Sequence, residues 1–230
     1  PMDRRTMLSM LAGAVATPSF AQMAKSPNTD AVDSKPYDVL QPAIAADRKR
    51  VRLLFAYDCP FCLRYHNGLV SWGASLPKSI TFDAFPVIAN LDNESVPMAI
   101  VGRLIGQALD PKVLPAYDYT MFTAIQGDPQ TGAMPKGVLN MDHVLKALVE
   151  AGINRADIQK FVRNKGKGIE KKLQAHADAV NTYQLKATPS IAIGGRYVIN
   201  PDHTQGNPQN LLLLLNGVVS RVVQGDFNAL

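Results

Sequence analysis

Cysteine is nearly absent from this chain of 230 residues, which contains two, and tryptophan occurs once. Two cysteines exclude the disulfide framework of small secreted domains, and they leave too few thiolates for a four-cysteine zinc site. The four histidines (His66, His143, His176 and His203) have no ligand-like spacing around them. No bound metal and no cofactor are therefore expected.

Charge of one sign is not concentrated in the chain either. The formal net charge is +5 and the isoelectric point is near 9.2, yet most lysines and arginines are dispersed among acids. The exceptions are Arg48-Lys49-Arg50 and the segment from Lys165 to Lys172. Neither is interleaved with aromatic residues, so no nucleic-acid partner is expected. A hydrophobic content of 47% is ordinary for a globular protein, and the length suits one domain with an insertion.

The two cysteines are three positions apart, in Cys59-Pro60-Phe61-Cys62. An apolar, strand-like run from Val51 to Tyr57 precedes them, and a helix-compatible run from Leu63 to Leu76 follows. This places the first thiol at the positive end of a helix, where its thiolate is stabilised and its pKa falls. Proline at an early helical position presets that geometry. The pattern indicates a dithiol/disulfide redox centre.

Other roles of a Cys-x-x-Cys pair fit less well. Covalent haem attachment needs histidine directly after the second cysteine, and Leu63 stands there. A structural zinc site lacks its remaining ligands. A permanent disulfide across so short a loop would stabilise the fold little, because it closes almost no chain.

The first residues are typical of an export signal. Arg4-Arg5 is followed by a short apolar stretch from Met7 to Thr17 and by Ser19-Phe20-Ala21, whose small residues suit cleavage after Ala21. We expect a signal peptide at 1–21, of the Sec or twin-arginine kind, a linker at 22–35 and a periplasmic location. Two alternatives stay open: an amphipathic N-terminal helix used for pairing chains, and a cytosolic reductase.

Hydrophobic periodicity and breaker residues predict an α/β fold. Strands are expected at 37–40, 51–57, 80–88, 190–193 and 196–199, the last two joined by a hairpin at Gly194-Gly195. Helices are expected at 59–76 with a break near Gly68 or Gly73, and at 94–109, 114–125, 141–151, 156–162, 168–183 and 208–223. The leucines at 211–215 suggest a face packed against the sheet. One domain would comprise 36–93 and 184–230, with 94–183 as a helical insertion.

A Cys-Pro-x-Cys after an apolar strand, a long helical stretch and then Thr188-Pro189 before a Gly-Gly hairpin resembles the thioredoxin fold. Over about residues 35–226 the chain more closely resembles bacterial periplasmic thiol–disulfide oxidoreductases of the DsbA type. The resemblance implies that Cys59 is the exposed nucleophile and Cys62 the buried resolving cysteine. It also implies that Pro189 is a cis-proline facing the pair, and that Thr188 offers main-chain hydrogen bonds to an extended substrate. Its partners would be unfolded or misfolded cysteine-containing proteins, and a membrane protein that reoxidises or reduces it.

The residues around the pair depart from the strongest oxidants of that family. Phe61 replaces a histidine and cannot donate a hydrogen bond, and Asp58 adds a negative charge. Both predict a less acidic Cys59 than that of DsbA, whose pKa is about 3.5. Leu53 stands where thioredoxin-like proteins often have a buried acid, and Thr188 is commoner in isomerases than in oxidants. Oxidase and isomerase therefore both stay open, as do a homodimer and a binding protein whose thiols are incidental.

Overall fold

The structure is a computed structural model that describes residues 35–165 and 168–225. The predicted signal peptide (1–21) and all but the last residue of the predicted linker (22–35) lie outside the described residues.

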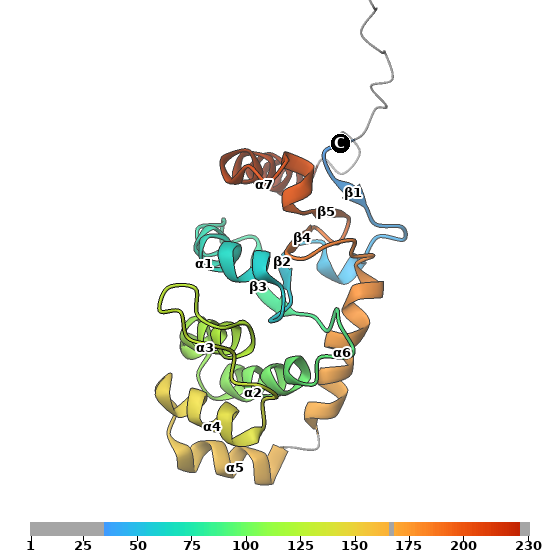
Figure 1. Ribbon diagram of the computed structural model, residues 1–230. Helices are drawn as coiled ribbons and strands as arrows, with labels where there is room; N and C mark the ends of the chain where they lie inside the picture. Colours follow the sequence, from blue (N-terminus) through green and yellow to red (C-terminus); the bar gives the residue numbers. More distant parts are fainter. Residues whose placement is uncertain (1–34, 166–167, 226–230) are drawn as a thin grey trace, which may run out of the picture. The chain divides into compact units, whose positions relative to one another are not determined.

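Five strands form one mixed sheet in the order β1-β5-β4-β2-β3 (Figure 1). Strand β2 is parallel to β3 and antiparallel to β4, and β5 pairs antiparallel with both β4 and β1. The strand predicted at 51–57 corresponds to β2, which has a neighbour on each side. The α/β prediction is thus confirmed. The bounds of the strands are β1 Asp38–Val39, β2 Arg50–Phe55, β3 Thr81–Pro86, β4 Ser190–Ile193 and β5 Tyr197–Ile199.

Helices α2 to α6 all lie between β3 and β4 in the sequence, and α2 contacts each of α3, α4, α5 and α6 (Figure 1). The division into a domain of 36–93 and 184–230 with an insertion at 94–183 stays a prediction. The bounds are α1 Pro60–Ala74, α2 Ser95–Leu109, α3 Leu114–Gln126, α4 Met141–Glu150, α5 Arg155–Lys165, α6 Ile169–Thr182 and α7 Pro208–Val223.

The prediction of a break in the helix near Gly68 or Gly73 is wrong, because α1 is continuous. A methyl group at Gly73 would lie 2.3 Å from the ring of Phe82 on β3. The glycine therefore allows close packing of helix on strand. The run of leucines in α7 divides by helical spacing. Leu211 and Leu215, four apart, are buried, whereas Leu213 is 70% exposed.

Alternation along β2 separates the core into two layers. Val51, Leu53 and Phe55 point into the larger core, which α1, α2, α3 and α7 supply with apolar side chains. Leu54 points to the opposite face, where Ala179 and Tyr183 near the end of α6 cover it. A strand with both faces covered explains why this run has almost no polar residue.

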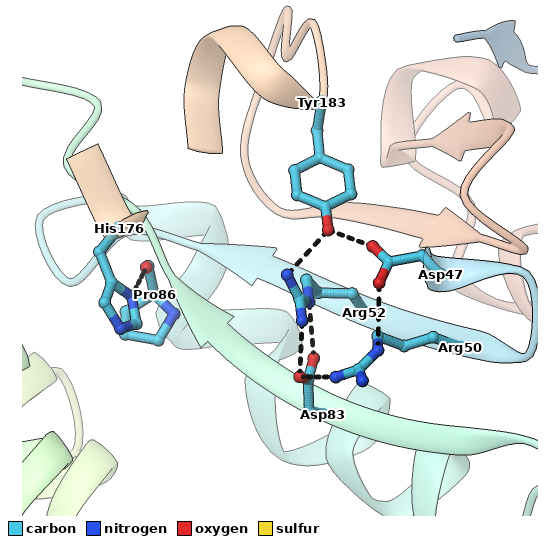
Figure 2. A network of polar contacts seen from close by, with 7 residues as sticks. All are labelled: Asp47, Arg50, Arg52, Asp83, Pro86, His176 and Tyr183. Carbon is cyan, nitrogen blue, oxygen red and sulfur yellow. Dashed lines mark hydrogen bonds and ion pairs between the residues drawn. The ribbon is translucent and has the colours of Figure 1, made fainter. Parts of the chain in front are cut away.

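The two polar side chains on the second face of β2, Arg50 and Arg52, are held by a network of polar contacts (Figure 2). Arg52 donates from Nε to Asp83 Oδ1 on β3 at 3.0 Å, and from Nη1 to the hydroxyl of Tyr183 at 2.8 Å. That hydroxyl in turn donates to Asp47, while Arg50 pairs with both Asp83 (2.9 Å) and Asp47 (3.2 Å). These contacts fix the end of α6 to strands β2 and β3.

His176 makes a second attachment of α6 to β3 (Figure 2). Its ring stacks on Phe85 with centroids 3.9 Å apart, and Nδ1 lies 2.6 Å from the carbonyl oxygen of Pro86. Burial lowers the pKa of His176 to about 4. The ring is therefore neutral at physiological pH and donates its Nδ1 hydrogen to that carbonyl.

The β4–β5 hairpin turns at Gly194 and Gly195, whose φ angles are +64° and +63°. Two successive residues with positive φ are required for the tight hairpin turn that matches strand twist. Gly195 also accepts a hydrogen bond from the N–H of Ile44 at 2.7 Å. The predicted hairpin is confirmed.

Alanine at Gly195 should destabilise the fold by about 1–3 kcal/mol, because the new methyl group would lie 2.1 Å from the carbonyl oxygen of Ile44 at a strained φ. Gly68→Ala is the matched control. That site is inside α1, and apart from the backbone of α1 itself and the adjacent residues no atom lies within 4 Å of the added methyl, so this variant should gain about 0.5–1 kcal/mol. Denaturant unfolding of both variants measures the difference, and equal stabilities would contradict the expectation.

Candidate active site at the start of helix α1

Cys59 is the N-cap residue of α1. Its backbone is extended, with φ −92° and ψ 116°, and Pro60 occupies the first helical position. The Sγ atom accepts a hydrogen bond from the backbone N–H of Cys62 at 3.3 Å. A sulfur replaces the usual capping oxygen, so the free N–H groups of the first turn point at the thiol.

The Thr188–Pro189 segment lies beside the same sulfur. The peptide bond between these residues is cis, and the Cys59 thiol donates to the carbonyl oxygen of Thr188 at 3.1 Å. The two motifs are 129 positions apart in the chain. Strands β2 and β4, which pair antiparallel from Leu54 opposite Ser190, bring them together.

The surroundings of Cys59 favour its thiolate. Hydrogen bonds from the Cys62 thiol, the Thr188 side chain and the N–H groups of Cys62 and Phe61 lower its pKa from 9.0 to about 6, although burial acts against them. A thiol with this pKa is largely ionised at pH 7, which makes it both a nucleophile and a good leaving group.

Cys62 is in the opposite state. Its side chain is fully buried, and the N–H of Ala56 approaches its sulfur at 3.5 Å. Burial, together with the charge of the neighbouring Cys59 thiolate, raises the pKa of Cys62 far above its ordinary value. Cys59 is thus a partly exposed thiolate and Cys62 a buried, protonated thiol. Disulfide exchange in one direction needs this difference between the two sulfurs.

The other predicted site residues border the pair. Phe61 is 58% exposed, and Asp58 accepts a hydrogen bond from the side chain of Asn93 at 3.3 Å. Phe61 and Thr188 line a small groove together with Tyr65 and Pro201. Asp58 lines a larger pocket of about 860 Å³, bordered by α1 and the loop after α3. The effect of Asp58 on Cys59 stays a prediction.

A buried polar cluster behind the pair went unpredicted. The hydroxyl of Tyr57, two residues before Cys59, donates to Asp118 on α3 at 2.5 Å. Asp118 also pairs with Arg103 on α2 at 3.0 Å and lies 3.4 Å from Nε2 of His66 on α1. All four side chains are buried. The sequence did carry a signal, because Arg103 and Asp118 are each the only charged residue of an apolar helix.

The described residues offer neither a metal site nor a membrane-spanning helix. Within residues 35–165 and 168–225, no cluster of three or more histidine, cysteine or acidic side chains is arranged to bind a metal ion. Over the same ranges, no helix combines the length and apolar character needed to cross a membrane.

The chain is similar to known proteins both in sequence and in structure. No family model matches the chain. A curated relative, the thiol:disulfide interchange protein DsbA of Bordetella parapertussis, is 23% identical over 207 residues, covering 87% of this chain and 89% of the relative. The crystal structure of Pseudomonas aeruginosa DsbA superposes with a TM-score of 0.62 at 19% identity, over 85% of this chain and 97% of that one. The DsbA of Proteus mirabilis in complex with a non-covalently bound peptide gives 0.62 at 18% identity, over 83% and 97%.

The resemblance to the DsbA type is confirmed. The similarity in structure establishes the fold, so the sheet and the helices between β3 and β4 form a DsbA-like thioredoxin fold as predicted. The similarity in sequence, which spans nearly the whole of both chains, supports the predicted thiol–disulfide oxidoreductase.

Proposed function

We propose that this protein is an exported thiol–disulfide oxidoreductase that exchanges disulfides with cysteine-containing proteins through Cys59 and Cys62. The observation that carries the proposal is the Cys59 sulfur, which caps α1 with the Cys62 N–H at 3.3 Å and lies 3.1 Å from the Thr188 carbonyl. In the proposed roles Cys59 is the nucleophile and Cys62 the resolving cysteine. Pro60, Phe61 and Asp58 tune the thiol, and Thr188 and Pro189 bind substrate.

The difference in burial supports this division of roles, because Cys59 is partly exposed and Cys62 is fully buried.

In the oxidase direction, a substrate thiolate attacks Sγ of Cys59 in the Cys59–Cys62 disulfide, and Cys62 leaves and takes up a proton. A second substrate thiolate attacks the substrate sulfur of the mixed disulfide and expels Cys59 as a thiolate. The substrate is oxidised by two electrons and the pair is reduced. The low pKa of Cys59 makes the second departure fast, and the high pKa of Cys62 makes its protonation favourable.

In the isomerase direction, the Cys59 thiolate instead attacks a non-native substrate disulfide, and Cys62 later displaces the substrate to release a trapped intermediate. Phe61 and Thr188 favour this branch. A homodimer would suit it, because a shared cleft can hold a misfolded chain. The mass in solution, measured beside the refolding of scrambled ribonuclease, separates the two branches: a monomer that oxidises thiols without reshuffling disulfides is an oxidase.

Substrate binding would use the groove beside Thr188. The exposed ring of Phe61 supplies an apolar contact next to the thiolate, and an extended segment can pair with the main chain of Thr188. The DsbA of Proteus mirabilis has a structure in complex with a non-covalently bound peptide, which supports a polypeptide ligand here. The signal-like sequence from Arg4 to Ala21 supports the periplasm as the proposed location. The proposed redox partner is a membrane protein.

The reduction potential of the pair should be about −180 mV, more negative than the value of about −120 mV for DsbA. Stabilising the Cys59 thiolate favours the reduced form and makes the protein more oxidising. With a pKa of about 6, this thiolate is less stabilised than that of DsbA, for which the pKa is about 3.5. Equilibration with glutathione over a range of ratios measures the potential. A value at or above that of DsbA would refute the argument from Phe61 and Asp58.

A further inference from the structure

Gln126, the last residue of α3, reaches the turn that carries the active-site cysteine. Its side-chain Nε2 donates to the carbonyl oxygen of Tyr57 at 2.6 Å and to that of Cys59 at 3.2 Å. The glutamine lies 69 and 67 positions from these residues in sequence. A single amide group on α3 thus contacts two carbonyls in the connection between β2 and α1.

The two carbonyls belong to a tight turn that sets the direction of Cys59. The N–H of Cys59 bonds to the carbonyl of Ala56 at 3.1 Å, and the residues between form the corner from strand to helix. Tyr57 is fully buried, so its carbonyl oxygen needs a hydrogen-bond partner, and the amide of Gln126 supplies one. Without that donor the Tyr57 carbonyl would lose this hydrogen bond, and the corner would lose its side-chain contact with α3.

The glutamine is itself held in place through the same tyrosine. Asp118, on the preceding turns of α3, accepts from the hydroxyl of Tyr57 and pairs with Arg103 on α2. Tyr57 is therefore bound by α3 at its hydroxyl and at its carbonyl. This double attachment fixes α3 relative to the corner and keeps the amide aimed at both carbonyls.

We propose that Gln126 is a positioning residue for Cys59, holding the β2–α1 corner in the geometry that presents the Cys59 sulfur to the N–H of Cys62. The inference rests on the proposed thiol exchange at Cys59 and names the part of the helical region that serves it. The Cys59 carbonyl also accepts from the N–H of Leu63 at 3.3 Å, so the contact with Gln126 is made where the corner passes into the first turn of α1. Loss of the amide loosens the corner and with it the alignment of the Cys59 sulfur with the N–H of Cys62, a hydrogen bond that favours the thiolate.

The test uses two substitutions in the full chain. Gln126→Met keeps the length of the side chain without its hydrogen bonds, and Gln126→Glu replaces the donor with a carboxylate that repels the carbonyls. The side chain is only half-buried, so both variants should fold. Gln130→Ala is the matched control, because Gln130 borders the same pocket in the exposed loop beyond α3.

The measurement is the ultraviolet thiolate absorbance of the reduced protein as a function of pH. The titration midpoint of Cys59 should rise by about half a unit in Gln126→Met and by more in Gln126→Glu. The equilibrium constant with glutathione at pH 7 should shift about threefold towards the disulfide form. A purely structural role would lower the melting temperature and leave the midpoint in place.

The outcomes separate this inference from the proposed function. If both Gln126 variants titrate like Gln130→Ala, the positioning role is wrong while thiol exchange stands. If Cys59 of the unmodified protein titrates at the ordinary value of a free thiol, the proposed function itself fails. A raised midpoint in both Gln126 variants, with the control unchanged, supports the inference.

Discussion

Cys59→Ser will reduce the oxidation of an unfolded, reduced protein to the rate seen without enzyme. The substituted hydroxyl cannot form a disulfide, and Cys62 cannot replace the missing sulfur because it is fully buried with a raised pKa. The measurement is the loss of free thiols from reduced ribonuclease mixed with the oxidised protein. This is the largest effect expected of any single substitution, because it removes the reacting atom.

Cys62→Ser is the informative partner variant. It keeps the Cys59 thiolate at the end of α1 but removes the sulfur that resolves the mixed disulfide. Covalent complexes with disulfide-containing substrates should therefore accumulate, and non-reducing gels followed by mass spectrometry would identify Cys59 as the linked residue. If Cys59→Ser still oxidises substrate, Cys59 is not the reacting thiol. If it loses oxidation but retains full function in cells, the alternative of a binding protein with incidental thiols gains support.

Asp118→Leu should lower the free energy of unfolding by about 3–5 kcal/mol, the range for breaking a buried ion pair. The substitution leaves the guanidinium of Arg103 buried without its carboxylate and removes the acceptor of the Tyr57 hydroxyl. In a chain of this size the melting temperature should fall by roughly 10 °C or more. Chemical denaturation gives the free energy directly.

A second substitution tests the reason for that loss. The double variant Asp118→Leu/Arg103→Met should recover much of the stability, because apolar residues can replace a buried pair at little net cost. Lys146→Ala is the surface control. Its pair with Glu150 is exposed, and its loss should change stability by less than about 0.5 kcal/mol. If the double variant is no more stable than Asp118→Leu, the unpaired charge is not the cause.

The same pair gives a pH dependence. Burial alone would raise the pKa of Asp118, but Arg103 and then His66 hold it below its usual value of 3.8. A carboxyl with a depressed folded-state pKa stabilises the fold above the pKa of the unfolded chain, and that stabilisation is lost as the pH falls through the folded-state value. Part of the acid sensitivity should thus disappear in the Asp118→Leu/Arg103→Met variant.

The features predicted from sequence are those encoded locally. A strand followed by Cys59, Pro60 and a helix needs only periodicity and capping rules, and two adjacent glycines specify the β4–β5 turn. The helix break failed for a physical reason. The lack of a side chain at Gly73 makes room for the ring of Phe82 on β3. That ring belongs to another element, so the sequence of α1 gives no sign of the contact.

Contacts between distant segments could not be predicted in the same way. Arg103 and Asp118 gave a usable hint, since a lone charge in an apolar helix must find a partner or face solvent. Gln126 gave none, because an amide at a helix end is more often a solvated residue. Its role depends on how α3 meets the β2–α1 corner, which is a property of the packed structure.

The edges of the sheet have their own importance for a protein proposed to handle unfolded chains. Strand β1 is two residues long, and Asp38 on it pairs with Lys186 and lies 3.6 Å from Nε2 of His203. At the opposite edge, the last carbonyl of β3 is taken up by His176. Short, charged or occupied borders discourage a client polypeptide from joining the sheet as an extra strand. A protein with such edges can bind unfolded chains repeatedly without being incorporated into their aggregates.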